Sequence, residues 1–404
     1  STPPIVINLM IDLLDRNLNN AKILEPSFGY GQFIWSLINK NPNVNIDVIE
    51  LNREIFKKSY NQFKTYPNIT LFNEDFLLKK FDIKYDLIIG NPPYGIVSSN
   101  NHYAIRVNQE TKKQYKMRTD TWYGKYNIYG AFIEKSIKLL KENGRLMFII
   151  PATWMILNDF KKLRIFMAKN GQTNIYYLGK NIFNGMNVTT CILFFKKEKS
   201  GLNLFLTDNL YSFPQMNLNR KDPSWSGEMI RFKTNKRDYF SKFQDNTVKD
   251  YFNIKISARS PEVKKIVKKN RIDNKANRLP FMKGKNIKKG YVLRVPYTKY
   301  YLDESEITDF KSFYSILPRI VVGHTKGGKL VSAIEDELFP YLGDVYHLLP
   351  KINFTKSELR TIVDWLNSDK MQEYLYDVYK EITPHITSLQ LKDIPIPIKK
   401  SQLF

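Results

Sequence analysis

The sequence is poor in the residues that build cross-links and transition-metal sites. Its 404 residues include a single cysteine, Cys191, and four histidines. One cysteine excludes a disulfide framework and a cysteine-rich zinc site, and so few histidines leave little material for a histidine-built metal centre. We therefore expect a protein of the reducing cytoplasm that holds no metal ion.

Long apolar runs are also missing. The run at 146–157 falls well short of the roughly 20 residues that a membrane-spanning helix needs, and it contains a proline. No signal peptide is recognisable at the beginning of the chain. The chain nevertheless has 43% hydrophobic residues, with 26 Phe and 25 Tyr, which is enough for large cores and excludes a disordered tail protein.

Acidic residues are few compared with basic ones. The 63 basic and 39 acidic side chains give a formal charge of +24. Residues 1–100 are balanced, with 10 of each sign, whereas residues 251–300 carry 15 basic and 2 acidic side chains. Self-repulsion of that size favours a partner that carries phosphates, although charge alone does not choose between a nucleic acid and a membrane surface.

Apolar runs alternate with helical patterns in the first half of the chain. Strands are expected at 21–24, 45–51, 69–72, 85–90, 145–150 and 189–195, and helices at 32–38, 54–63 and 128–141. This alternation favours an α/β fold with a doubly wound, Rossmann-like, mostly parallel sheet that has helices on both faces.

The alternation is interrupted twice. Residues 95–127 are polar and basic, so we expect a long loop of the kind that is a functional lid or disordered. After about residue 200 the alternation ends. We therefore expect a catalytic domain at 1–210, a linker at 211–235 and a mixed α/β domain with short strands at 236–404. The basic residues of the loop and of the last domain would form two walls of a groove.

Acidic side chains follow the first three expected strands. Glu25, Glu50 and Asp75 come at their carboxyl ends, where ligands bind in doubly wound sheets, and the turn Gly29-Tyr30-Gly31 lets backbone approach a ligand. An acidic residue after the second strand is typical of a ribose site. A nicotinamide dinucleotide is disfavoured, because the third glycine is missing and Glu25 would repel a pyrophosphate. S-adenosylmethionine fits better, since its ammonium group can face Glu25.

The fourth strand is followed by Asn91-Pro92-Pro93-Tyr94, the most specific motif of the chain. The prolines stiffen the backbone, and two carbonyl oxygens, of the Asn91 side chain and the Pro92 main chain, can accept both hydrogens of an exocyclic amine. That nitrogen gains positive charge as a methyl group is attached, so fixed acceptors stabilise the transition state. Tyr94 offers a flat face on which a planar base or amide can stack.

Residues 91–94 resemble the catalytic motif of amino-methyltransferases, which methylate exocyclic or side-chain amide nitrogens. Residues 2–4 resemble an N-terminal cofactor motif, and the order of motifs resembles the gamma class of DNA adenine-N6 methyltransferases, with a C-terminal target-recognition domain. The likeness to the Taq-type enzymes, which modify the adenine of TCGA, runs over nearly the whole chain. Further similar segments are 126–132, 151–154, 258–261, 324–327, 347–350, 365–368 and 384–385.

The resemblance implies a role for each matched residue. The cofactor-binding residues would be Thr2, Glu25, Ser27, Gly29, Glu50, Leu51, Asp75, Phe76, Asn91 and Phe132. The catalytic residues would be Asn91 and Pro92, which hold the target amine, with Tyr94 and Phe183 against the flipped base. The DNA-binding residues would be Arg259, Lys326 and Pro384, the last filling the gap in the duplex. The turn at 27–31 departs from the commoner version with small residues, which leaves Phe28 and Tyr30 without a role.

The implied reaction is in-line methyl transfer from S-adenosylmethionine to adenine N6, after the base has left the stack of double-stranded DNA. A monomer is the simplest expectation. The same chemistry fits three alternatives, methylation of a protein glutamine, of an RNA base or of cytosine N4, and a catalytically inactive DNA-binding protein is a fourth. A fusion with a restriction nuclease is disfavoured, because no nuclease-like motif is recognisable.

Overall fold

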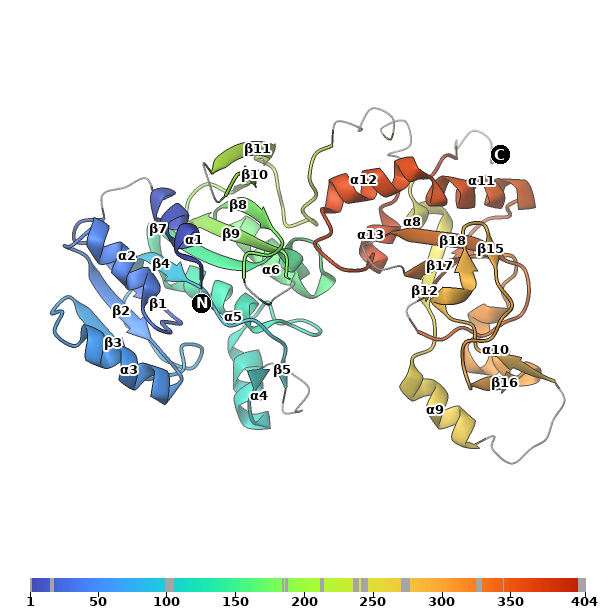
Figure 1. The fold of residues 1–404 in the computed structure, drawn as a ribbon, viewed down its shortest axis with the longest axis horizontal. Coiled ribbons are helices and arrows are strands. Elements are labelled where there is room, and N and C mark those ends of the chain that lie inside the picture. Colours follow the sequence, from blue (N-terminus) through green and yellow to red (C-terminus); the bar gives the residue numbers. More distant parts are fainter. Residues whose placement is uncertain are drawn as a thin grey trace. The chain divides into compact units, whose positions relative to one another are not determined.

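The computed structural model describes residues 2–14, 18–98, 105–183, 185, 188–210, 214–234, 240, 246–269, 277–324, 329–343 and 345–398. The chain divides into two compact units, residues 1–232 and residues 233–404 (Figure 1). None of the helices in the described part of the chain is long and apolar enough to cross a membrane.

The first unit is built on a nine-stranded sheet with the order β11-β10-β8-β9-β7-β4-β1-β2-β3. The strands are β1 (Lys22–Glu25), β2 (Asn45–Ile49), β3 (Ile69–Phe72), β4 (Tyr85–Gly90), β7 (Leu140–Pro151), β8 (Gln172–Gly179), β9 (Thr190–Lys196), β10 (Gly201–Asp208) and β11 (Gln215–Asp222). The five strands from β3 to β7 are parallel, β9 is antiparallel to both neighbours, and β11 is antiparallel to β10. The expected α/β sheet is confirmed.

Helices cover both faces of this sheet, which explains why its central strands are apolar without a break. The helices are α1 (Pro4–Asp12), α2 (Gln32–Lys40), α3 (Arg53–Phe63), α5 (Ile128–Leu139) and α6 (Lys161–Asn170), with short 3-10 turns at Ala152–Met155 and Asn158–Phe160. On β4, Leu87 and Ile89 join the core cluster that includes α1 and α2. Ile88 is fully buried and, by strand alternation, points to the other face, where α5 and α6 pack.

The expectation of one long loop at 95–127 is wrong. This segment contains β5 (Val97–Ser98), β6 (Ile105–Arg106) and the ten-residue helix α4 (Gln109–Arg118). Asn108 caps α4 by accepting a hydrogen bond from the Thr111 N–H at 2.7 Å. Tyr115 is the one buried residue of the helix, so no 3.6-residue apolar pattern announces it in the sequence.

The segment expected to be a linker, 211–235, is in part a strand of the first unit. β11 lies inside it and pairs along its whole length with β10. β11 is an edge strand of the sheet and is largely polar, so its sequence has the composition of a loop. The division of the chain falls at residues 232 and 233, near the end of the expected linker.

The second unit has a mixed α/β structure with short strands, as expected. Its antiparallel sheet has the order β12-β19-β17-β18, and β13 pairs with β16 and β14 with β15. The strands are β12 (Phe252–Ile256), β13 (Arg278–Pro280), β14 (Ile287–Lys288), β15 (Tyr291–Val292), β16 (Tyr301–Asp303), β17 (Arg319–His324), β18 (Leu330–Glu335) and β19 (Val345–Pro350). The helices are α8 (Val248–Tyr251), α9 (Ser260–Lys269), α10 (Ile307–Phe310), α11 (Lys356–Asn367), α12 (Asp369–Tyr379) and α13 (Ser388–Lys392).

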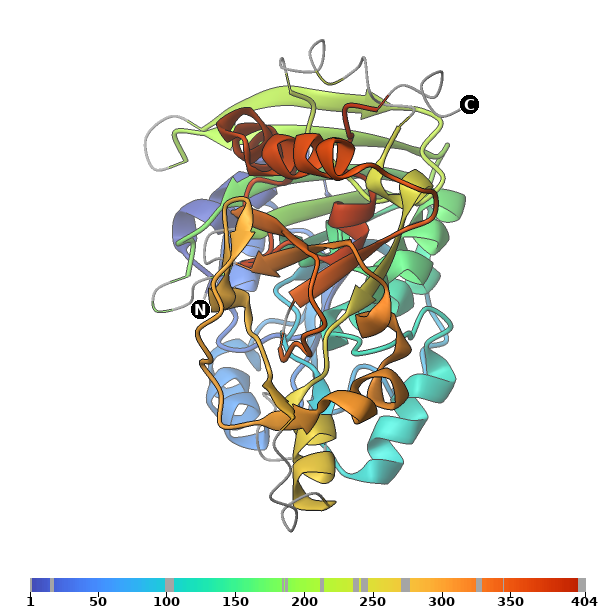
Figure 2. The same cartoon turned by 90° about the vertical axis from the view of Figure 1, so that its right-hand side faces the viewer.

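Helix α9 lies at the opposite end of this second unit from α11 and α12 (Figures 1 and 2). Its apolar side belongs to the core of the unit, with Val263 fully buried and Ile266 and Val267 packed against it. Lys264, Lys265 and Lys268 are not buried. The sequence of α9 thus places its lysines on the surface because the apolar residues of the same helix must be inside.

Candidate active site

The carboxyl ends of β1, β2 and β4 meet at one edge of the sheet, because these strands are parallel neighbours. Glu25 ends β1, Glu50 follows β2, and Asn91 follows β4. Hydrogen bonds join these ends: the Gly29 N–H donates to Glu50 Oε2 at 2.9 Å, and the Ser27 hydroxyl donates to the Asn91 carbonyl at 2.9 Å. The structure therefore brings the expected cofactor residues and the NPPY segment together.

Glu25 is a buried carboxylate without a full set of partners. Its side chain is only 1% exposed, and Oε2 has no hydrogen-bond partner among the described residues. Burial, and then the nearby charge of Glu50, raise the pKa of Glu25 well above its usual value. A buried acceptor of this kind is costly unless a cationic donor meets it, so the site is suited to an ammonium group.

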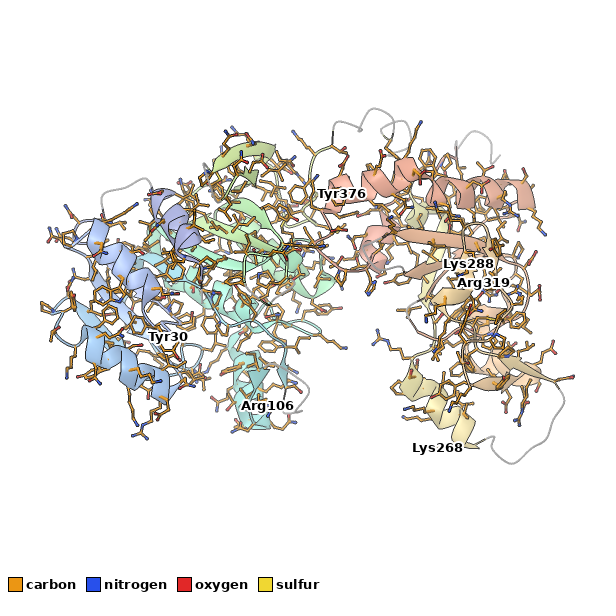
Figure 3. The ribbon with its side chains drawn as sticks, in the orientation of Figure 1. Tyr30, Arg106, Lys268, Lys288, Arg319 and Tyr376 are labelled. Carbon is orange, nitrogen blue, oxygen red and sulfur yellow. The ribbon has the colours of Figure 1, made fainter. Side chains whose placement is uncertain are left out.

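The turn at 27–31 contains Phe28 and Tyr30, the two residues that had no role in the sequence, and the structure gives a role to Phe28. Phe28 is part of the core and packs edge-on against Phe63, with ring centroids 5.3 Å apart. Gly31 has a φ of +77°, and a Cβ there would come within 2.6 Å of Phe63. Tyr30 is 56% exposed on the surface of the first unit (Figure 3). Phe28 therefore anchors the turn, Tyr30 does not, and a Cβ on Gly29 would meet open space.

Glu50 is held in place by two backbone donors. Besides Gly29, the Asn52 N–H donates to Glu50 Oε1 at 2.7 Å, and Asn52 in turn caps α3 through the N–H groups of Glu54 and Ile55. Leu51, beside it, is 63% exposed. This position suits a carboxylate that accepts from ribose hydroxyls while an apolar side chain covers one face of a base.

Asp75 lies beyond the end of β3 and is held from two sides. The Leu77 N–H donates to Oδ1 at 2.8 Å, and the Tyr115 hydroxyl donates to Oδ2 at 2.5 Å. Next to it, the rings of Phe76 and Phe132 are 4.9 Å apart. The contact from Tyr115 was not predicted from the sequence, in which it is separated from Asp75 by 40 residues.

Asn91 has the most informative geometry of the site. Its amide nitrogen Nδ2 donates to Thr2 Oγ1 at 3.0 Å, so the side-chain oxygen Oδ1 faces away from that contact. Oδ1 is buried and has no hydrogen-bond partner in the part of the chain that the structure describes. The backbone carbonyl of Asn91 already accepts from Ser27, and Pro92 is buried behind it. The free oxygen is therefore an acceptor prepared for a donor from outside the protein.

Tyr94, three residues after Asn91, forms an aromatic corner with Phe183. Their ring centroids are 6.2 Å apart at an interplanar angle of 73°, and Phe183 belongs to the buried core cluster. The Tyr94 hydroxyl donates to the Ile149 carbonyl at 2.7 Å, and burial raises the pKa of Tyr94 well above its usual value. Tyr94 therefore keeps its proton, and its fixed ring is suited to stacking and not to proton abstraction.

The expected DNA contacts belong to the second unit. Arg259 is exposed directly before α9, and its N–H donates to Glu262 Oε2 at 2.5 Å. Pro384 is exposed in the loop between α12 and α13, beside Thr383 and His385, which line a cavity of about 620 Å³. Lys326 lies outside the described residues.

A buried polar network supports the strand that leads to Arg259. Arg319, labelled in Figure 3, is fully buried, and its Nε donates to His347 Nδ1 at 3.1 Å. His347 Nε2 is 2.7 Å from the hydroxyl of Ser257, which follows β12. Because Arg319 is always a donor, Nδ1 accepts and the proton is on Nε2; burial, and then Arg319, hold the pKa of His347 well below its usual value. The network is structural: Ser257 accepts a hydrogen bond from His347, so the histidine does not act as a base that would activate the serine as a nucleophile.

The fold and the strand-end constellation define the class as S-adenosylmethionine-dependent methyltransferases. The family described as Eco57I restriction-modification methylase matches residues 10–183, and the TaqI-like C-terminal specificity domain matches residues 279–396. The chain is 36% identical over 403 residues to the Type II methyltransferase M.TthHB8I of Thermus thermophilus, covering 98% of this chain and 89% of that protein. The chain belongs to the family of Type II restriction-modification DNA methyltransferases.

Other relatives match in part. The modification methylase CviBIII of Paramecium bursaria Chlorella virus NC1A is 31% identical over 184 residues, which are 45% of each chain. A nuclease-deletion mutant of the Type ISP restriction-modification enzyme LlaGI, solved with a DNA substrate mimic, matches with a TM-score of 0.57 and 12% identity. That match covers 98% of this chain and 53% of the other, and at this identity it supports the fold alone.

Proposed function

We propose that this protein transfers a methyl group from S-adenosylmethionine to the N6 amine of an adenine flipped out of double-stranded DNA, within TCGA. The observation that carries the proposal is the buried Oδ1 of Asn91, which has no partner among the described residues and belongs to an amide group that Thr2 orients. An adenine amine has two hydrogens to donate, so the Asn91 side chain and the Pro92 carbonyl would each accept one.

Catalysis then depends on where charge develops. When S-adenosylmethionine is bound, it supplies an electrophilic methyl group, whose C–S bonding pair returns to sulfur as the amine lone pair forms the C–N bond. The nitrogen becomes positively charged before a proton leaves it for water. Asn91 and Pro92 stabilise this charge with acceptors that are already in place, and Tyr94 keeps the base in line.

The cofactor fits the described residues. The free Oε2 of Glu25 would receive the ammonium group, Glu50 would accept from the ribose hydroxyls, and Asp75 would accept from the adenine amine. Ser27 and Gly29 would lie beside the methionine end, while Leu51, Phe76 and Phe132 would enclose the adenine. The Thr2 hydroxyl accepts the hydrogen bond from Asn91 with a lone pair, so its own proton remains available. It would donate this proton in a hydrogen bond to the cofactor carboxylate.

The second unit would provide recognition. Its basic residues would contact phosphates, which position the duplex without specifying a sequence, and Arg259 would contact a base or phosphate. Lys326 is a further candidate, and Pro384 would fill the gap that the extruded adenine leaves. A monomer suffices for this arrangement.

Sequencing of single DNA molecules from cells that express the protein tests the proposal, since it reports the modified base and its context together. N6-methyladenine within TCGA is the expected result. N4-methylcytosine would overturn the adenine assignment, and N6-methyladenine in another sequence would overturn only the proposed specificity. Unmodified DNA, with label from S-adenosylmethionine in RNA or protein, would remove DNA as the substrate.

Thr2→Val should lower kcat by about five- to tenfold, because Asn91 loses the hydrogen bond that orients its amide. Valine has nearly the same shape as threonine, so the packing around position 2 is kept. Steady-state kinetics at saturating S-adenosylmethionine measure this effect. An unchanged kcat would mean that Asn91 is oriented without Thr2.

Neutralising Lys264, Lys265 and Lys268 together, by replacement with Gln, should weaken DNA binding and flatten its salt dependence. The slope of log K against log salt should decrease by about one for each lysine that contacts a phosphate. The matched control neutralises Lys57, Lys58 and Lys64, which are exposed on or next to α3. Equal slopes for both triple variants would exclude α9 from the DNA-binding surface.

A further inference from the structure

Helix α4 is attached to the first unit through one buried side chain. Apart from Tyr115 and the exposed Met117 its residues are polar, and Tyr115 alone among them is buried, with 3% of its surface exposed. A polar helix gains little from packing, so the position of this tyrosine decides where the helix lies. Arg118 adds a second attachment by donating to the Leu78 carbonyl at 2.6 Å.

Both attachments of α4 are made to the segment that carries Asp75. The Tyr115 hydroxyl is 2.5 Å from Asp75 Oδ2, and Leu78 is three residues farther along the chain. Lys135 holds the same segment from α5, by donating to the carbonyls of Leu77 at 3.0 Å and Lys79 at 2.6 Å. The carboxylate is therefore fixed at both oxygens, by the Leu77 N–H and by Tyr115.

We infer that Tyr115 is a positioning residue for the adenine end of the cofactor, acting through the Asp75 carboxylate. The inference rests on the proposed role of Asp75 as acceptor for the adenine amine. A carboxylate oxygen has two lone pairs, so Oδ2 can accept from Tyr115 and from a second donor. With the hydroxyl in place, the carboxylate does not have to be ordered when the amine arrives, which favours binding.

The phenol is suited to this role because it remains a donor. Burial, and then the hydrogen bond to Asp75, raise the pKa of Tyr115 above its usual value, so the hydroxyl keeps its proton throughout the range in which the protein is handled. Phenylalanine at this position keeps the ring and its packing and removes only the donor. The variant Tyr115→Phe therefore separates the hydrogen bond from the burial of α4.

The cofactor product S-adenosylhomocysteine and its deaminated analogue, compared by calorimetry, test the inference without the methylation reaction. S-adenosylhomocysteine carries the adenine amine, and S-inosylhomocysteine has an oxygen in its place. Tyr115→Phe should weaken the binding of S-adenosylhomocysteine about five- to tenfold and leave S-inosylhomocysteine unchanged. The control Tyr123→Phe, at a half-exposed tyrosine just after α4, should change neither affinity.

A second variant keeps the test independent of folding effects. In an Asp75→Ala background, Tyr115→Phe should have no further effect on either ligand, because the group through which the hydroxyl acts is gone. Equal weakening of both ligands, unchanged binding or tighter binding of S-adenosylhomocysteine by Tyr115→Phe would overturn the inference. Failure of the unmodified protein to bind either ligand would instead overturn the proposed cofactor site.

Discussion

Replacement of Asn91 by alanine is expected to lower kcat for DNA methylation by about 10³-fold. The side-chain oxygen that this change removes is buried and has no partner among the described residues, and in the proposed reaction it accepts from the substrate amine. The affinity for S-adenosylmethionine should change little, because Ser27 is bonded to the Asn91 backbone, which remains. Single-turnover methylation and calorimetry, made on the same preparation, separate the two effects.

Asn61→Ala is a suitable control for this variant. Asn61 is an exposed asparagine in α3 of the same unit, and its replacement should leave kcat and cofactor affinity unchanged. If Asn91→Ala methylated DNA at nearly the rate of the unmodified protein, the free oxygen would not be the acceptor in the transition state. If it lost cofactor binding as well, the side chain of Asn91 would be needed for the cofactor, and the loss of kcat could not be assigned to the substrate amine.

Glu25→Gln should weaken the binding of S-adenosylmethionine by roughly 10- to 100-fold, the range for a hydrogen bond to a charged group. The variant keeps the size of the side chain and removes the charge that would face the ammonium group. In the unmodified protein the affinity should fall as the pH falls through the raised pKa of Glu25, because the ammonium group prefers the carboxylate. The affinity of the variant should not show this dependence.

The same variant should be more stable than the unmodified protein in the absence of cofactor. Because the pKa of Glu25 is raised in the folded state, its contribution to stability is present below the unfolded pKa and is lost as the pH rises through the folded pKa. Glutamine stays neutral and has no such loss. The melting temperature of Glu25→Gln should therefore exceed that of the unmodified protein at neutral pH, with the difference closing near about pH 4.

Glu54→Gln provides the matched control for both measurements. Glu54 is exposed in the first turn of α3, where its side chain is 77% accessible, so its replacement should affect neither cofactor affinity nor the pH dependence of melting. A Glu25→Gln variant that bound S-adenosylmethionine normally would show that the ammonium group lies elsewhere.

The central sheet and the strand-end carboxylates could be predicted because both follow from local sequence. A strand buried on both faces must be a short apolar run, and parallel strands bring their carboxyl ends to one edge, so Glu25, Glu50 and Asn91 had to be neighbours. The hydrogen bonds within the site could not be predicted in this way. Thr2 and Asn91 are 89 residues apart, and only the folded chain shows which amide atom remains free.

Two of the elements that escaped prediction, α4 and β11, bury little, whereas α1, α6, β8 and β10 were missed although they carry buried apolar residues. Helix α4 has one inward side chain and β11 is a largely polar edge strand, so neither has the apolar pattern on which sequence reasoning depends. The bond from Tyr115 to Asp75 was missed for the same reason, since the helix that carries it was expected to be a loop. Phe28 was unassigned because its partner, Phe63, is at the end of α3 and far away in the sequence.

The identity of the methylated base tests the account most directly. Purified protein, S-adenosylmethionine with a labelled methyl group and a duplex containing TCGA would be incubated together, and the DNA would be digested to nucleosides for mass spectrometry. The account predicts label in N6-methyldeoxyadenosine, and its loss in the Asn91→Ala variant. Label in N4-methyldeoxycytidine, or equal labelling by the variant, would contradict it.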